Sequence, residues 1–217
     1  MLAWFPKGPA WNFLTASLYR GKQSAAINFK KKEGRGLILK LAAKSDIFVE
    51  GFRAGALEKA GLGYKDVYKV NPKIIYCSIS GYGQKGPRRR WGSHDINYLA
   101  LSGFLSMMPK EKGAPGLPPI PVGDLGGGSL YAVISILAAL EERRRSGKGQ
   151  YLDVSILDGL RSWMLSSRAW AMAAQTFPIP RHSRESGNPG LMAADNRAKK
   201  ILFFGGSDPF YRAYQTQ

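Results

Sequence analysis

Short apolar strands alternate with helical segments along this chain, and this alternation constrains the fold more than any other feature. Strands are predicted at Ser24–Asn28, Asp46–Glu50, Lys73–Ile79 and Tyr151–Ile156. Strands that alternate with helices pair in parallel, because each intervening helix carries the chain back along the sheet. The predicted fold class is therefore α/β, with a doubly wound, mainly parallel sheet.

Helices are predicted between these strands wherever apolar residues recur at a helical spacing. Their ranges are Lys32 to about Lys44, Leu57–Leu62, Tyr64–Val70, His94 to about Met107, Ser129–Arg145 and Leu157–Ala174, while 109–121 is expected to be a proline-rich loop. The 217 residues are enough for one sizeable core, and 44% hydrophobic with 22% charged residues is a globular composition.

Composition also bears on the compartment. We expect no membrane span, because no apolar run in the sequence reaches the length that a span needs. The chain has a single cysteine, Cys77, which excludes an internal disulfide, and it shows no signal-peptide pattern at its start. These features favour a cytoplasmic protein.

The chain is strongly basic, with a net charge of +17 from 32 basic and 15 acidic residues. A basic excess of this size is typical of nucleic-acid binding, but it also suits a phosphate-rich small molecule beside a solvated basic surface. The sequence has no zinc-finger spacing, RNA-recognition signature or basic zipper. Nucleic acid is therefore the minority interpretation.

The stretch Gly92–Gly103 places polar groups at the start of a predicted helix. Ser93 is predicted to cap the helix, with His94 and Asp95 in its first turn. Backbone N–H groups are unpaired there and the local field is positive, so an anion, or an oxygen that becomes one, is well placed at this end. Taken alone, His94 would more often be an ordinary capping or core histidine.

A second polar cluster, Val122–Ser129, puts Asp124 in a predicted glycine-rich turn before another apolar helix. On its own, Asp124 would more often be a turn aspartate. Together, His94 and Asp124 could supply two bases that flank one reacting carbon.

The run Gly81–Gly86 matches the dinucleotide-binding pattern G-x-G-x-x-G by letter. That pattern needs a helix that opens directly on its last glycines. Here Pro87 and three arginines follow, so we interpret the run as a polar loop at the edge of the sheet.

Five segments in one order resemble the family III CoA-transferases and their racemase branch. They are GFRAGALEKAGLGYKDV, NPKIIYCSISGYGQKGP, GSHDINYLALSG, GDLGGGS and SGKGQYLDVSILDG. The similarity runs from Gly21 to about Ala174 and resumes at Gly205–Tyr211. The histidine in Ser93–Tyr98 is similar to the racemase branch, whereas the transferases generally lack it and use the later aspartate as nucleophile.

The resemblance implies a Rossmann-like large domain and the inversion of the 2-methyl-bearing α-carbon of acyl-CoA thioesters. His94 and Asp124 would then be the two proton-transfer groups. It implies no metal and no redox cofactor, since CoA is part of the substrate, and a homodimer of interlocked subunits. The residues that it places against CoA or substrate are Arg20, Ile27, Asn28, Phe29, Lys30, Gly51, Phe52, Arg53, Ser93, Asp95, Ile96, Asn97 and Tyr98.

The chain also departs from the family pattern, which leads us to expect a fragment. We expect an irregular segment at 1–20 without the family's first strand unit, a CoA-binding α/β domain at 21–176, a disordered insert or linker at 177–200, and the start of a truncated connection to the family's small domain at 201–217. Three hypotheses remain open: an acyl-CoA racemase, a CoA-transferase with Asp124 as nucleophile, and an inactive CoA-binding fragment.

Overall fold

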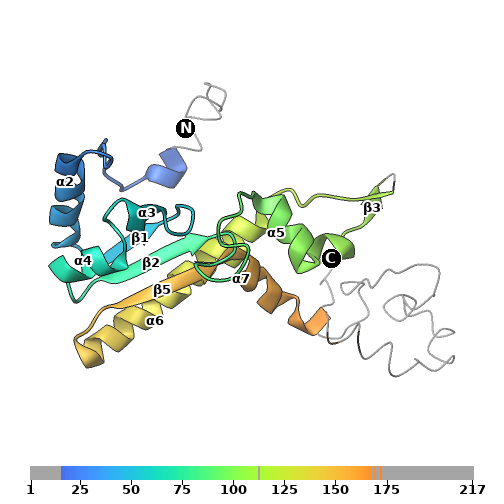
Figure 1. The fold of residues 1–217 in the computed structure, drawn as a ribbon. Helices are drawn as coiled ribbons and strands as arrows, with labels where there is room; N and C mark the ends of the chain where they lie inside the picture. Colours follow the sequence, from blue (N-terminus) through green and yellow to red (C-terminus); the bar gives the residue numbers. More distant parts are fainter. Residues whose placement is uncertain (1–15, 112, 168, 170–171, 173–217) are drawn as a thin grey trace, which may run out of the picture.

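A three-stranded parallel sheet forms the centre of the molecule. The computed structural model describes residues 16–111, 113–167, 169 and 172. In it, β1 (Ile47–Glu50), β2 (Ile75–Ser80) and β5 (Gln150–Ser155) lie in the order β1-β2-β5 (Figure 1). Both pairs are parallel, so the predicted α/β class with a parallel sheet is confirmed.

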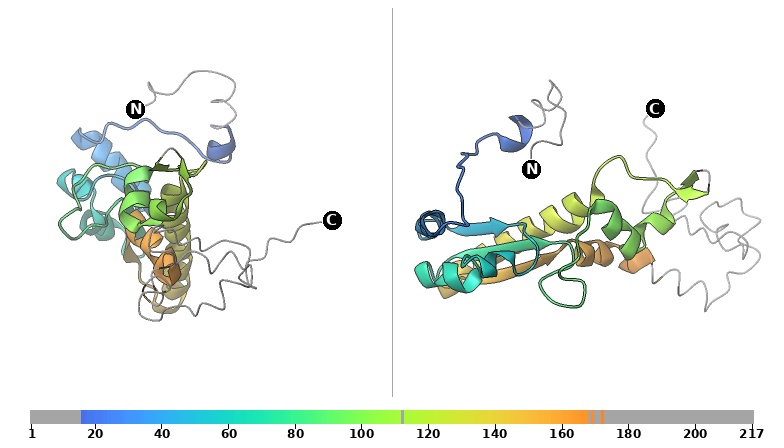
Figure 2. Two further views of the ribbon diagram at one scale, coloured as in Figure 1. Left: turned by 90° about the vertical axis from the view of Figure 1, so that its right-hand side faces the viewer. Right: turned by 45° about the horizontal axis from the view of Figure 1, so that its top comes forward.

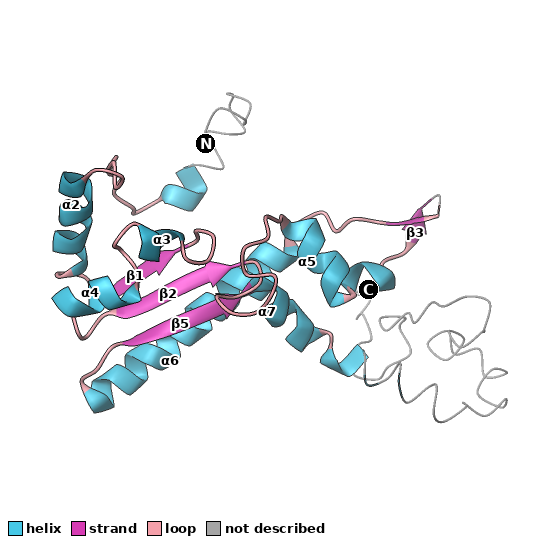
Figure 3. Ribbon diagram, in the orientation of Figure 1, coloured by secondary structure: helices cyan, strands magenta, loops and turns pink. Residues whose placement is uncertain are grey.

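Helices cover both faces of this sheet, as Figures 2 and 3 show. The alternation of side chains along β2 sends Tyr76 to one face and Cys77 to the other. Tyr76 packs with residues of α2 and α4, and Cys77 packs with Ala132 of α6. The helices are α2 (Lys32–Ala42), α3 (Ala56–Lys59), α4 (Tyr64–Val70), α5 (Asp95–Ser102), α6 (Tyr131–Ser146) and α7 (Ile156–Trp163).

The strand predicted at Ser24–Asn28 is wrong. Residues 22–28 have no ladder partner in the described part of the chain, where β1 pairs with β2 alone. Asn28 instead closes a turn that leads into α2: its side-chain oxygen accepts from the Lys30 N–H at 3.1 Å and its carbonyl accepts from the Lys31 N–H at 3.2 Å. A polar side chain that bonds its own backbone favours a turn over a strand.

The helix predicted from His94 to Met107 is shorter than expected. It ends at Ser102, because Gly103 adopts a left-handed conformation with φ of 89°, and a 3₁₀ turn at Phe104–Met107 follows. The proline-rich loop contains a small antiparallel hairpin, β3 (Lys110–Glu111) with β4 (Ala114–Pro115).

The glycine-rich turn predicted before α6 is also wrong. Residues Gly123–Leu130 form a π-helix that continues directly into α6. The combined helix, Gly123–Ser146, has 24 residues and is the one helix in the described part that is long and apolar enough to cross a membrane, contrary to our expectation that no run reaches that length. By itself this is weak evidence for a span, because core helices of soluble proteins meet the same test.

Three of the predicted segments lie largely or wholly outside the described residues. In the segment 1–20 only residues 16–20 are described, and 16–19 are helical. The predicted insert at 177–200 and the predicted connection at 201–217 lie outside the described residues. The helix predicted to reach Ala174 is described as α7 up to Trp163, with further helical residues at 165–167, and its predicted end lies outside the described residues.

Candidate functional site

The start of α5 differs from the sequence prediction by one residue. His94, not Ser93, is the capping position, with extended backbone at φ −130° and ψ 174°. Asn97 holds it there, because its side-chain oxygen accepts from the His94 N–H at 2.9 Å. Ser93 instead donates its hydroxyl to the Tyr98 hydroxyl oxygen at 2.7 Å. The imidazole of His94 is consequently exposed at the mouth of the helix.

One carboxylate joins the start of α5 to the start of the π-helix. Asp95 Oδ1 accepts from the backbone N–H of Asp124 at 2.8 Å. The bond satisfies one of the N–H groups that a helix start leaves unpaired, and it links two elements that are 29 positions apart. Asp95, which the resemblance places against the substrate, therefore has one oxygen engaged in fixing Asp124.

His94 and Asp124 are electrostatically coupled in the folded chain. Burial raises the pKa of the Asp124 carboxyl from its ordinary 3.8, the neighbouring Asp95 charge raises it further, and His94 opposes both effects. The two groups that the resemblance implies for proton transfer are therefore near enough for their charges to interact, and both residues are exposed. A carboxyl with a raised pKa that interacts with an imidazole is a candidate for acid–base chemistry.

The glycines of the π-helix are required by close packing against α7. A Cβ on Gly127 would lie 2.5 Å from the Ile156 carbonyl oxygen, and one on Gly126 would lie 2.0 Å from the Trp163 ring. On the other side of the contact, a Cβ on Gly159 would lie 2.2 Å from the Gly127 carbonyl oxygen. The extra residue of a π-helical turn often occurs at functional sites, and here the π-helix carries Asp124.

Sequence reasoning missed Gly159 and Trp163 as part of this arrangement. Trp163 is 43% exposed, with its ring against Gly126. The available signal was the pairing of a triple glycine with a single glycine in the next helix, which is typical of closely packed helices.

The loop after β1 approaches the start of α5. The Phe52 ring meets the Phe29 ring edge-on at 5.7 Å between centroids, which joins the loop to the segment before α2. Arg53 lies against Gly92, where an added Cβ would be 2.7 Å from the guanidinium Nη2. The Arg53 guanidinium therefore lies against a residue that is two positions before His94 in the sequence. Gly51, Phe52 and Arg53 are all exposed.

The remaining predicted binding residues lie around these groups. Arg20 follows the helical residues 16–19 and is exposed, and Lys30 is exposed in the turn before α2, where Ile27 is half-buried. Ile96 and Asn97 are exposed on the first turn of α5. Tyr98 is buried and packs edge-on against Tyr82, with ring centroids 5.5 Å apart, so it anchors α5 to the loop that carries Tyr82.

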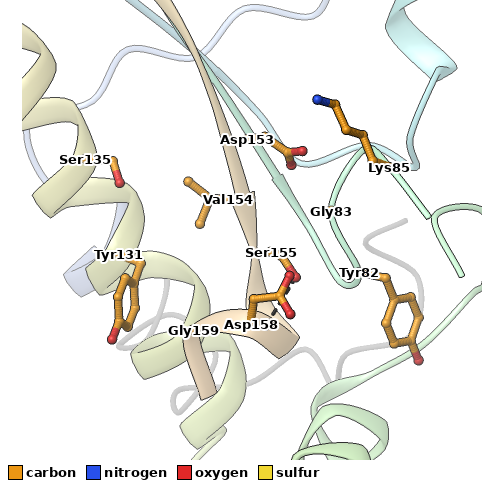
Figure 4. A pocket seen from close by; sticks show the side chains of 10 residues that line it. All are labelled: Tyr82, Gly83, Lys85, Tyr131, Ser135, Asp153, Val154, Ser155, Asp158 and Gly159. Atoms are coloured by element: carbon orange, nitrogen blue, oxygen red, sulfur yellow. Dashed lines mark hydrogen bonds between the residues drawn. The ribbon is translucent and has the colours of Figure 1, made fainter. Parts of the chain in front are cut away.

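The loop at Gly81–Gly86 leads to no helix until Asp95, so the rejection of a dinucleotide-binding site is confirmed for this run. The loop lines a cavity of about 350 Å³ at the end of β5 (Figure 4). Its charged lining residues are Lys85, Asp153 and Asp158, and neither His94 nor Asp124 lines it. We therefore base the candidate active site on the coupled pair and not on this cavity.

A metal centre has no support in the part of the chain that the structure describes, which contains no group of three or more His, Cys, Asp or Glu side chains placed to hold an ion.

Comparison with known proteins identifies the family of the chain and supports its fold. The family model described as CoA-transferase family III matches residues 3–216. Alpha-methylacyl-CoA racemase of Mus musculus is 39% identical over 199 residues, which are 92% of this chain and 47% of the relative. Succinyl-CoA:glutarate CoA-transferase of Mus musculus is 42% identical over 141 residues, which are 65% of this chain and 32% of the relative.

A solved structure gives the same result. The crystal structure of a CAIB/BAIF family protein from Brucella suis superimposes with a TM-score of 0.68 at 32% identity, covering 71% of this chain and 41% of that chain. The chain belongs to CoA-transferase family III. It spans about half the length of the racemases it matches.

Proposed function

We propose that this chain carries the catalytic pair of an acyl-CoA racemase, an isomerase that inverts the 2-methyl-bearing α-carbon of a CoA thioester. The observation that carries the proposal is the coupling of His94 with Asp124 at the starts of two helices. The similarity to alpha-methylacyl-CoA racemases over most of this chain supports it.

The chemistry needs one base and one acid on opposite faces of the α-carbon. One group of the pair removes the α-proton, and the electrons of the C–H bond pass into an enolate whose charge rests on the thioester oxygen. The other group then donates a proton to the opposite face, so that the composition of the substrate is unchanged. The first N–H groups of a helix lack partners within it, so those at the start of α5 are suited to stabilise the enolate oxygen.

The CoA portion carries phosphates, and the basic residues around the loop after β1 match that charge. Arg53 lies beside the start of α5 and Lys30 lies in the turn before α2. We propose that these two side chains bind the anionic part of CoA while the thioester reaches His94 and Asp124. The net charge of +17 assists the approach of such a ligand.

A second candidate function is CoA transfer, with Asp124 as nucleophile. The 42% identity to a succinyl-CoA:glutarate CoA-transferase favours it. In this reaction the Asp124 carboxylate attacks the thioester carbonyl and CoA thiolate leaves, which gives a mixed anhydride on Asp124. The thiolate then attacks the Asp124 carbonyl, which releases the donor as its free carboxylate and leaves a CoA thioester on Asp124. The acceptor carboxylate attacks this thioester, and the thiolate that leaves attacks the acceptor carbonyl of the new anhydride, which forms the new acyl-CoA and frees Asp124. A transferase therefore needs an added acceptor acid for turnover, whereas a racemase does not. A chain that binds CoA without either reaction is the third possibility.

We also propose that the chain forms a homodimer through α6. Val133, Ile134 and Leu137 of α6 are 53–61% exposed and lie on one face of that helix, as does the preceding Leu130. An apolar stripe of this kind is typical of an interface. A second copy of the chain would bury it.

The test is exchange of the α-proton of a 2-methylacyl-CoA in deuterated water, followed by NMR. We expect exchange by the unaltered chain without any acceptor acid, and its loss in both His94→Ala and Asp124→Asn. Asp158→Asn is the matched control, because it alters a carboxylate of the cavity in Figure 4 and leaves the pair intact. Folded protein that shows no exchange overturns the proposal, and exchange that requires an acceptor acid favours the transferase.

A further inference from the structure

Glu50 is a half-buried acid at the carboxyl end of β1, next to the loop that carries Phe52 and Arg53. Its Oε2 accepts from the Phe52 N–H at 2.7 Å, and its Oε1 accepts from the Ser78 hydroxyl. Ser78 lies on β2 and is 1% exposed. One carboxylate thus connects a rigid, buried strand to the first residues of an exposed loop.

The connection extends across the whole sheet. Gln84 donates its side-chain amide to Ser78 Oγ at 2.6 Å, and its backbone N–H lies 3.1 Å from each carboxylate oxygen of Asp153 on β5. Glu50, Ser78 and Asp153, which lie side by side in the register of the three strands, therefore share one chain of hydrogen bonds. Groups linked in this way restrict one another's positions more than isolated bonds do.

Stability alone does not explain a carboxylate at this position. Burial raises the pKa of Glu50, Glu58 adds a like charge, and the bonds from Ser78 and Phe52 oppose the shift only in part. None of the ion pairs within the described residues involves Glu50. A partly buried charge without a counter-ion costs free energy, and an apolar residue of the same size is often the more stable choice.

What the Glu50 carboxylate does is fix the backbone from which two predicted CoA-binding side chains emerge. Phe52 packs on Phe29 at 5.7 Å, and Arg53 lies against Gly92, two residues before His94. A displacement of the Phe52 backbone would move the side chains of Phe52 and Arg53 together. Fixing them before the ligand arrives removes an ordering cost from binding.

We propose that Glu50 is a positioning residue for the CoA site, which acts through the Phe52 N–H to hold Arg53 at the start of α5. The proposal rests on the proposed function in that it takes CoA as the ligand of this loop. Glu50 itself does not contact the ligand.

An isosteric pair of variants tests this role. Glu50→Met keeps the size of the side chain and removes both acceptor oxygens, while Glu50→Gln keeps one acceptor and removes the charge. Glu58→Gln is the matched control, because Glu58 is the like charge that acts on Glu50 and is exposed on α3. Each variant is titrated with CoA by calorimetry, and its thermal unfolding is measured.

We expect Glu50→Met to bind CoA about tenfold more weakly with an unchanged or higher melting temperature, since the loop without its acceptor must be ordered when CoA binds. Glu50→Gln and Glu58→Gln are expected to stay within about threefold of the unaltered chain. In the exchange assay, Glu50→Met should raise KM and leave kcat nearly unchanged, because the lost interaction concerns binding alone. CoA binding by Glu50→Met within threefold of the unaltered chain overturns the proposal.

A second readout separates this proposal from the proposed function. The hydrogen-exchange rate of the Phe52 amide, measured by NMR without ligand, should be faster in Glu50→Met than in Glu50→Gln or the unaltered chain. If the unaltered chain does not bind CoA, the proposed function is wrong, and equal Phe52 exchange rates in all variants overturn the positioning role as well. If CoA binds and the variants do not differ, only the positioning role is wrong.

Discussion

Replacing Gly159 by alanine tests the contact that places Asp124. Gly159 lies inside α7 and faces the π-helix, and a Cβ there would be 2.2 Å from the Gly127 carbonyl oxygen and 2.8 Å from the Gly127 Cα. Both neighbours are backbone atoms of a helix, so no flexible side chain can turn aside. The methyl group can be accommodated only if α7 and the π-helix move apart.

Two opposing effects set the size of the change. Alanine favours an α-helix over glycine by about 1 kcal/mol. Overpacking of a well-packed contact costs about 1–3 kcal/mol and more where backbone must move. Ordinary contact begins near 3.4 Å, so the approach at Gly159 is more than 1 Å too close. We therefore expect Gly159→Ala to destabilise the chain by about 2 kcal/mol, the overpacking cost taken at the upper end of its range.

The assay is urea unfolding monitored by tryptophan fluorescence, with Gly36→Ala as the control. Gly36 also lies in a helix, α2, but an added Cβ there meets no atom within 4 Å, so this variant should gain up to about 1 kcal/mol. In the exchange assay, Gly159→Ala should also lose activity, because the separation of the helices displaces Asp124. A Gly159→Ala variant as stable as the unaltered chain would refute the reasoning.

Three further predictions follow from individual contacts. Asp124→Asn should stabilise the chain more at pH 7 than at pH 3. A raised carboxyl pKa gives stability that is present below the ordinary value of 3.8 and is lost as pH rises, whereas asparagine stays neutral at both pH values. Urea unfolding at the two pH values measures the difference, and an equal effect of the substitution at both contradicts the prediction. Asn71→Ala should cost about 1–2 kcal/mol in the same assay, because its side chain donates to the Ala42 and Ser45 carbonyls at 3.0 and 2.8 Å; a neutral result contradicts this. Ile134→Glu should shift the chain from dimer to monomer in light scattering, and an unchanged mass would contradict the α6 interface.

The parallel sheet could be predicted because its strands are apolar runs with clear turn residues between them. β2, Ile75–Ser80, is buried along nearly its whole length, and a buried strand has an apolar sequence. Such a run can be recognised as a strand without knowledge of its neighbours in the sheet. The Ser24–Asn28 prediction failed because the same apolar pattern, in a shorter run, says nothing of whether a neighbouring edge is free to pair. Pairing depends on residues distant in sequence.

The site shows the same division between local and distant information. His94 at a helix start could be predicted from nearby residues, and the cap was misplaced by one position because Asn97, not Ser93, supplies the bonding oxygen. The helical state of Gly123–Leu130 could not be predicted from propensity, since glycine disfavours helices. Contact with α7 overrides that preference.

The positions of His94 and Asp124, the proposed catalytic pair, therefore depend on α7, which contributes neither residue. α5 and the π-helix both pack on α7: Leu99 of α5 shares a core cluster with Leu157 and Leu160, and Gly127 lies against Leu160. Asp95 then adds the direct bond between the two helix starts. α7 follows β5 directly, and β5 pairs with β2 at the centre of the sheet. The positions of His94 and Asp124 are therefore fixed relative to the sheet through α7. The loop with Arg53 is held to the same sheet through the bonds of Glu50 to Phe52 and Ser78. The sheet therefore aligns the two halves of the proposed site, the Arg53 loop and the pair of His94 and Asp124, in addition to any contact between them.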